Sequence, residues 1–302
     1  MMSEIKDLQA RFGIPNRLRI VNGPDHLPCL QITSDLCQGQ IYLHGAHVTA
    51  WQPAGQKPVI WMSQKSWFEP NKPIRGGVPI CFPWFGPHPD NADLPAHGFA
   101  RLRSWELTET RQAEGGAIEV MMLLQSSAET RPLWPFDFEL RYHVSFGRTL
   151  VLELETKNTS RSAMTVGEAL HTYFAVGDVR QVRVTGCEGK QFIDKVDEKK
   201  MKVQDGAIVF TGETDRVYLG ATGENVIEDS AMGRKITVKK SGSPNTVVWN
   251  PWVAKAKAMA DFGDEEWPGM VCVETCHVPP SALELPAGAV HGMRAVVGAA
   301  TI

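Results

Sequence analysis

The chain has 302 residues, of which 43% are apolar and 22% charged, a composition typical of a globular protein. Its 31 lysines and arginines against 34 aspartates and glutamates give a formal net charge of −3, which offers no reason to expect a nucleic acid or an anionic membrane surface as a partner. The N-terminus lacks the layout of a secretory signal, the apolar stretches fall short of the ~20 residues that cross a bilayer, and six scattered cysteines do not resemble a disulfide framework. We therefore expect a soluble, cytoplasmic protein with free thiols.

The predicted elements are mostly short strands. Residues 2–12 are compatible with a short amphipathic N-terminal helix. Alternation of apolar and polar residues over 138–146 and 150–155, around a short link that contains Gly147, predicts a hairpin, and similar pairs flank 114–116 and 241–245. Residues 254–260 predict one or two helical turns. Strands and helices do not alternate, so we expect an all-β fold with a few short helices, in which residues 1–302 form one large antiparallel β-sandwich domain.

The stretch from Pro70 to Gly98 differs from the rest of the chain. It carries seven prolines, together with Phe82, Trp84 and Phe85. Proline cannot donate to a β-ladder, and long loops within compact domains are usually functional or disordered. The aromatic content argues against disorder. We expect an ordered loop that lines a pocket.

Two arginines belong to this loop system. Arg75 precedes two glycines, and Arg101 follows His97-Gly98 at the end of the loop. Glycines allow the backbone to approach a ligand, and a guanidinium offers a fork of donors, so the two arginines could converge on a phosphate. As isolated features, arginines are more often solvated surface residues. No phosphate-binding motif of a nucleotide or dinucleotide site is present, which disfavours a nucleotide cofactor.

Two further residues are candidates for proton transfer. His171 lies among apolar and aromatic neighbours, and an imidazole titrates near cellular pH, although a histidine there could also be a core residue. Glu274 shares one face of a predicted strand with Met270, Cys272 and Cys276. A carboxylate on an apolar face needs either a partner or a function.

Metal ligation is not favoured. Cys272, Cys276 and His277 lack a second matched pair, and buried thiols are the simpler interpretation. His44 and His47 are predicted to point to opposite faces of a strand.

Seven segments, in this order, resemble those of the hexose-6-phosphate mutarotases (glucose-6-phosphate 1-epimerases) of the galactose-mutarotase-like superfamily. The resemblance covers nearly the whole chain. The segments are Leu-His-Gly-Ala-His-Val (43–48), Pro-Ile-Arg-Gly-Gly-Val-Pro (73–79), His-Gly-Phe-Ala-Arg (97–101), Ala-Leu-His-Thr-Tyr-Phe (169–174), Thr-Asp-Arg-Val-Tyr (214–218), Val-Trp-Asn-Pro-Trp (248–252) and Val-Cys-Val-Glu (271–274).

This resemblance implies a β-supersandwich that uses no metal or organic cofactor. It implies catalysis by His171 as the acid and Glu274 as the base. For the other site residues it implies contacts of Arg75 and Arg101 with a sugar phosphate, of Asp215 with the sugar, and of His97 with the ring oxygen. The partner is then a small sugar phosphate. As the net charge indicates, no nucleic acid or membrane partner is expected, and a monomer is compatible with the sequence, which does not decide the oligomeric state.

Two departures bear on the sugar preference, since many relatives have glutamine in place of Ala96 and Pro-Gly in place of Thr275-Cys276. Three alternatives remain open at this stage. The first is an aldose 1-epimerase that acts on free hexoses. The second is a glycoside hydrolase that uses Glu274 and Asp215. The third is a carbohydrate-binding sandwich without catalytic activity.

Overall fold

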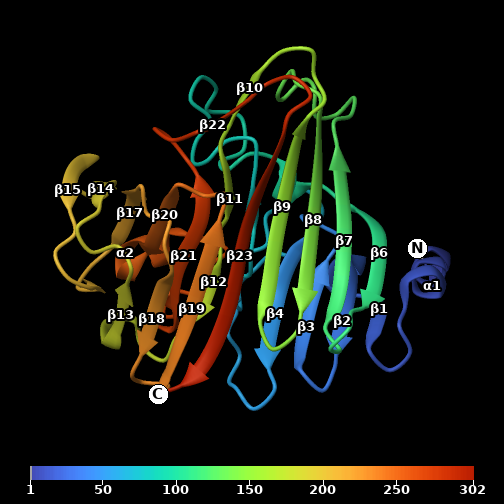
Figure 1. Cartoon of the computed structure of the whole chain (residues 1–302), viewed down its shortest axis with the longest axis horizontal. Helices are drawn as coiled ribbons and strands as arrows, with labels where there is room; N and C mark the ends of the chain where they lie inside the picture. The colour runs from blue at the N-terminus through green and yellow to red at the C-terminus, as the bar shows by residue number, and fades with distance from the viewer. Residues whose placement is uncertain (1) are drawn as a thin grey trace.

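The computed structural model describes residues 2–302, and strands are its main regular elements (Figure 1). The helical elements of this part of the chain are α1 (Met2–Phe12), α2 (Trp252–Ala258) and the 3₁₀ turns η1 (Pro24–His26), η2 (Ala100–Leu102), η3 (Val179–Gln181) and η4 (Trp267–Gly269). The all-β prediction is confirmed. None of the helices described in residues 2–302 has the length and apolar character needed to cross a membrane.

The largest sheet has nine antiparallel strands (Figure 1). Their order is β16 (Ile208–Val209), β13 (Val182–Thr185), β18 (Asn225–Asp229), β19 (Arg234–Ser241), β23 (Val290–Thr301), β9 (Leu150–Asn158), β8 (Phe138–Phe146), β7 (Ile118–Gln125) and β6 (Glu106–Gln112). In β8 and β9 the apolar members of the alternation are buried, and the two strands pair from Phe138↔Asn158 to Phe146↔Leu150. The hairpin predicted here is confirmed, as is the one around 114–116, which joins β6 and β7.

A second large sheet carries the residues of the cavity described below. Its order is β15 (Lys200–Val203), β14 (Gln191–Asp194), β17 (Thr214–Leu219), β20 (Asn245–Asn250), β21 (Met270–His277), β11 (Glu168–Leu170) and β5 (Ile80–Cys81), and β12 (Tyr173–Ala175) also pairs with β21. Both β11 and β12 are antiparallel to β21. The two residues between them therefore lie beside the middle of β21.

Two smaller sheets complete the layers. One consists of β1 (Leu18–Asn22), β2 (Pro28–Thr33), β3 (Cys37–Tyr42) and β4 (His47–Pro53), and the other of β10 (Met164–Val166) and β22 (Leu283–Leu285). The four-stranded sheet lies behind β6 to β9 in Figure 1, and the indole of Trp51 in β4 donates to the carbonyl of Gly147, 3.2 Å away. One continuous cluster of buried apolar side chains fills the space between the sheets.

The hairpin predicted around 241–245 is wrong. β19 pairs with β18 and β23, whereas β20 pairs with β17 and β21 in the other large sheet. The turn carries the chain from one sheet to the other. Gly242 has a φ of +67° and lies so close to β23 that an added Cβ would be 1.9 Å from the carbonyl oxygen of Gly292. Alternation predicts the strands on each side of a turn, but it does not identify their partners.

The helix predictions hold with one shift. The N-terminal helix has the predicted bounds, and the second, α2, begins and ends two residues earlier than predicted. The side chain of Asn250 accepts a hydrogen bond from the N–H of Trp252 (2.9 Å) just before it. The proline-rich segment 70–98 contains only the two-residue strand β5, and its remaining residues are ordered loop, as predicted.

Candidate active site

A cavity of about 950 Å³ opens on one face of the eight-stranded sheet. Residues paired across neighbouring strands form rows on this face, and alternate residues of each strand point to it. The floor of the cavity consists of two such rows. One row is Val217, Val247 and Glu274, and the next is Asp215, Trp249 and Tyr173, with the buried Cys272 between the last two. The wall comes from the loop system predicted to line a pocket, with Arg75, Phe85, Ala96, His97 and Arg101. All six residues singled out from the sequence, Arg75, His97, Arg101, His171, Asp215 and Glu274, line this cavity.

His171 and Glu274 lie side by side on the cavity floor. The Nδ1 atom of His171 is 3.4 Å from Oε1 of Glu274, and the side chains are 9% and 1% exposed. The imidazole stacks on the ring of Tyr173 with centroids 4.9 Å apart and lies edge-on to Trp249. Among the residues that the structure describes, neither carboxylate oxygen of Glu274 has a hydrogen-bond partner. A buried carboxylate without a donor is costly, so this one is suited to a hydroxyl of a ligand.

Burial favours the uncharged forms of both groups. It raises the pKa of Glu274 well above 4.5, with Asp215 adding to the rise and the charge of Lys195 opposing it. It lowers the pKa of His171 well below 6.5, and the charges of Arg101 and Arg75 lower it further. The two groups are close enough to titrate as a unit, and over the range between their two pKa values the pair holds one proton.

His97 presents a hydrogen-bond donor to the cavity. Its Nδ1 accepts the backbone N–H of Gly86 at 3.3 Å, so in the neutral ring the hydrogen is on Nε2. Burial, followed by the charge of Arg101, lowers its pKa well below 6.5 and keeps the ring neutral. The residue has a φ of +64°, a left-handed conformation that is uncommon outside glycine and is concentrated at functional sites.

The two arginines differ in their electrostatic environment. Arg75 is paired with Asp261, whose Oδ2 is 3.2 Å from Nε and 3.1 Å from Nη2, and its Nη1 donates to the hydroxyl of Tyr173 at 3.0 Å. Arg101 is buried and donates from Nη2 to the carbonyl of Ala96 (2.8 Å), while its Nε has no hydrogen-bond partner in residues 2–302. Burial lowers the pKa of Arg101, and the charge of Arg75 adds to this. Arg101 is therefore a buried cation of the cavity that lacks compensation by an acid, and an anionic ligand would stabilise it.

Three lysines, Lys195, Lys199 and Lys255, also line the cavity, and the sequence analysis identified none of them. Lys195 is the one that lies beside Asp215. Its Nζ lies 3.4 Å from Oδ1 of Asp215 and 4.8 Å from the ring centroid of Phe85. Asp215 is thus held at the cavity by a salt bridge, and Lys195 opposes the effect of burial on Glu274.

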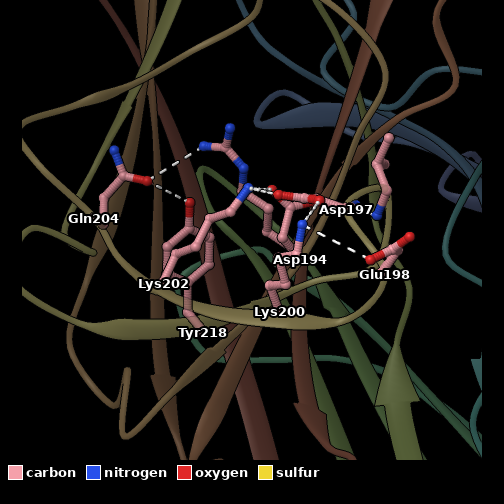
Figure 2. Close-up of polar contacts among 9 residues, drawn as sticks. Asp194, Asp197, Glu198, Lys200, Lys202, Gln204 and Tyr218 are labelled. Atoms are coloured by element: carbon pink, nitrogen blue, oxygen red, sulfur yellow. Dashed lines mark hydrogen bonds and ion pairs between the residues drawn. The ribbon is translucent and has the colours of Figure 1, made fainter.

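Lys195 belongs to the turn of the hairpin formed by β14 and β15 at the edge of the sheet. Figure 2 shows the ion pairs that hold this hairpin, in which Nζ of Lys202 contacts Asp194 (2.8 Å) and Asp197 (2.7 Å) and Nζ of Lys200 contacts Asp197 (2.7 Å). In the sequence these residues form a run of mixed charges typical of a solvated turn. No local signal distinguishes Lys195 from its neighbours.

The residues weighed as metal ligands have other surroundings. Cys272 and Cys276 share the face of β21 that carries Glu274, whereas His277 lies on the opposite face. Nε2 of His44 donates to the carbonyl of Lys72, and Nε2 of His47 donates to that of Gly76, both at 2.8 Å. These two histidines anchor the loop that carries Arg75.

Comparison with known proteins gives consistent results. The sequence profile of the aldose 1-epimerase family matches residues 28–297. A protein of Escherichia coli (strain K12) provisionally named glucose-6-phosphate 1-epimerase is 41% identical over 254 residues, which cover 84% of each chain. A relative of the same name from Cenchrus ciliaris is 40% identical over 259 residues, 83% of this chain and 76% of the relative.

Solved structures agree. The crystal structure of a Salmonella typhimurium protein provisionally described as a mutarotase superposes with a TM-score of 0.90 at 34% identity, and the match covers 99% of this chain and 100% of that one. A galactose mutarotase related enzyme from Lactobacillus acidophilus shares the fold at 16% identity, with a TM-score of 0.71 over 90% of this chain and 97% of that one. The profile match over most of the chain, together with relatives at about 40% identity, shows that this protein is an isomerase of the aldose 1-epimerase family.

Proposed function

We propose that this isomerase interconverts the α and β anomers of a hexose 6-phosphate, with glucose 6-phosphate as the preferred substrate. The observation that carries the proposal is a buried acid–base pair, His171 and Glu274 at 3.4 Å, in a cavity whose wall holds the uncompensated guanidinium of Arg101. The names of the relatives at about 40% identity point to the same substrate.

The spacing of the pair suits the reaction, because mutarotation exchanges protons at two oxygens bonded to the same carbon. Burial favours the uncharged pair, but the arrangement of the one-proton pair that reacts carries that proton on His171. Glu274 then accepts the proton of the O1 hydroxyl while His171 donates a proton to the ring oxygen O5, and the C1–O5 bond breaks. The resulting aldehyde rotates about the C1–C2 bond. The ring then closes on the other face of C1, with the two groups exchanging roles. Each group contributes roughly 10²–10⁴-fold to the rate.

The other residues of the cavity bind and orient the sugar. The Nε2–H of His97 donates to the ring oxygen or a neighbouring hydroxyl, and Asp215, held by Lys195, accepts from a sugar hydroxyl. The phosphate is remote from C1, so Arg101 and Arg75 supply binding and orientation. Ala96 lines the cavity where many relatives have glutamine, and its carbonyl positions Arg101.

The alternatives fit the geometry less well. A glycoside hydrolase uses two carboxylates about 5–9.5 Å apart, whereas here the closest partner of Glu274 is an imidazole at 3.4 Å. A mutarotase for free hexoses remains the nearest rival, and it leaves Arg101 without an anion.

Arg101→Ala is expected to lower the ratio of kcat/KM for glucose 6-phosphate over glucose by about 10-fold to 100-fold, since a hydrogen bond to a charged group contributes about 1.5–3 kcal/mol. Arg75→Ala is expected to lower the same ratio less, because Asp261 already neutralises Arg75. The measurement is exchange spectroscopy by NMR on the anomers of both sugars. A wild-type ratio near one, or one that neither substitution changes, would favour the mutarotase for free hexoses.

The pH dependence of kcat/KM is expected to be bell-shaped, with a plateau between the two pKa values of the pair. The active pair holds one proton. It gains a second on the acid side, well below pH 6.5 because burial lowers the pKa of His171, and loses its proton on the alkaline side, well above pH 4.5 because burial raises the pKa of Glu274. Glucose is the control substrate, since a phosphate titrates near pH ~6 itself. A flat profile with glucose would contradict the assignment of the pair.

A further inference from the structure

A second cluster of ligand side chains lies outside the cavity, where the two large sheets meet. Glu168 begins β11, His277 ends β21 and His291 lies near the start of β23. One ligand atom from each of the three residues lies within 4.8 Å of the other two. Glu168 and His277 are direct partners across the β11–β21 ladder, and His291 pairs with Thr156 of β9 in the nine-stranded sheet. The cluster therefore joins both sheets.

The carboxylate of Glu168 is fully buried and only half satisfied. Its Oε2 accepts the hydroxyl hydrogen of Thr156 at 2.6 Å. Its Oε1 has no hydrogen-bond partner among residues 2–302 and lies 3.7 Å from Nε2 of His291. A buried carboxylate oxygen is stabilised by a cation or a donor, and here it faces an imidazole nitrogen.

The two histidines direct the same ring nitrogen to one point. Nε2 of His277 lies 2.8 Å, and Nε2 of His291 lies 2.9 Å, from the carbonyl oxygen of Gly242. On the other side of its ring, Nδ1 of His277 is 3.3 Å from the carbonyl oxygen of Ser281. A carbonyl oxygen only accepts, so each Nε2 here carries the hydrogen that it donates to Gly242. When a metal takes the place of these hydrogens, His277 can hold its proton on Nδ1, which faces the carbonyl of Ser281, the usual arrangement for a histidine that binds a metal.

The spacing of these atoms matches a coordination shell. Ligand atoms 2.0–2.2 Å from a zinc ion lie about 3–3.5 Å from one another. The separations here, 2.8 and 2.9 Å from Gly242 to the two imidazoles and 3.7 Å from His291 to Glu168, bracket that range. The carbonyl of Gly242 is held in place because its turn packs against Gly292 of β23 without room for a Cβ.

We propose that Glu168, His277, His291 and the carbonyl oxygen of Gly242 bind a divalent transition metal ion, best matched by Zn²⁺, that joins the two large sheets at one end of the β11–β21 ladder. Two imidazoles and a carboxylate form a donor set suited to zinc. The proposal does not rest on the substrate assignment, because the site lies on the face of β21 opposite Glu274.

The test is a calorimetric titration of ZnCl₂ into the full chain, without a histidine tag, after treatment with EDTA and dialysis. One equivalent is expected to bind, and His291→Ala is expected to weaken binding more than about 100-fold, because even the loss of an outer-shell partner costs about 10- to 100-fold. Zinc at about 100 times its Kd is expected to raise the Tm of the wild type by roughly 5 °C and that of His291→Ala much less. His277→Ala provides an independent second variant.

Two control variants separate this site from other imidazoles. His143→Ala removes a half-buried histidine whose two ring nitrogens face different carboxylates, those of Glu119 and Glu153. His171→Asn removes an imidazole of the cavity. Both are expected to bind zinc as the wild type does. The proposal is overturned if no zinc binds, if binding persists unchanged in both His291→Ala and His277→Ala, or if it is lost in His171→Asn.

Discussion

Replacing Glu274 with glutamine is expected to lower the kcat for anomer exchange by at least about 10²-fold and to leave the KM for glucose 6-phosphate within a few-fold of wild type. The amide has nearly the same shape as the carboxyl group, so it fits between Val247 and His171 on the cavity floor. It can neither accept the O1 proton nor return it. The loss therefore falls on the chemical step.

The same substitution is not expected to lower stability. Glu274 has no hydrogen-bond partner within residues 2–302, so the change to an amide breaks no hydrogen bond. It also replaces a buried ionisable group with a neutral one. Thermal unfolding of the variant and NMR exchange on the same sample separate a chemical effect from a folding defect. Glu228→Gln, on β18 of the other large sheet, is the matched control and should exchange anomers at the wild-type rate. An exchange rate of Glu274→Gln within a few-fold of wild type would exclude Glu274 as the base.

Local patterns in the sequence account for much of the fold. The alternation in β8 and β9 is long and regular, and the structure buries the apolar face that the pattern selects. For Glu274 the same rule correctly predicts the face, because a strand in the middle of a sheet has fixed sides. The proline- and aromatic-rich segment is an ordered loop that lines the cavity through Phe85, although Phe82 is a core residue.

The remaining features depend on contacts between distant segments, which no local pattern encodes. The turn at 241–245 resembles a hairpin turn, and only the pairing of β19 with β23 and of β20 with β21 shows that it links two sheets. Lys195 reaches the cavity because β14 lies beside β17 and brings it to Asp215. The difference between the two arginines depends on Asp261, which is far from Arg75 in the sequence.

The sequence analysis did not single out Glu168, although a local pattern could have identified it. It lies between Val166 and Leu170 in an apolar stretch, so the argument that singled out Glu274 applies to it equally. Its partners could not have been found in this way. His291 belongs to a strand of the other large sheet, and the two residues meet only where the sheets pack together.

His171→Asn is expected to lower the kcat for anomer exchange by roughly 10²-fold or more, as for the loss of a general acid. Asparagine keeps a polar group near Glu274 but cannot carry a proton to O5. It also removes the stack on Tyr173, so His97→Asn is the matched control. That substitution also removes a buried imidazole of the cavity but takes away only a donor, and its effect on kcat should be smaller.

The double variant His171→Asn, Glu274→Gln tests whether the two groups act as a unit. Each group needs the other to complete the proton exchange. The kcat of the double variant is therefore expected to lie close to that of the slower single variant, and its fold-loss should be much smaller than the product of the fold-losses of the two single variants. NMR exchange rates of the four proteins at one pH within the plateau give the coupling directly. Losses that multiply would mean that the two residues act independently. A His171→Asn enzyme with the wild-type rate and pH profile would reduce His171 to a packing residue against Tyr173 and Trp249.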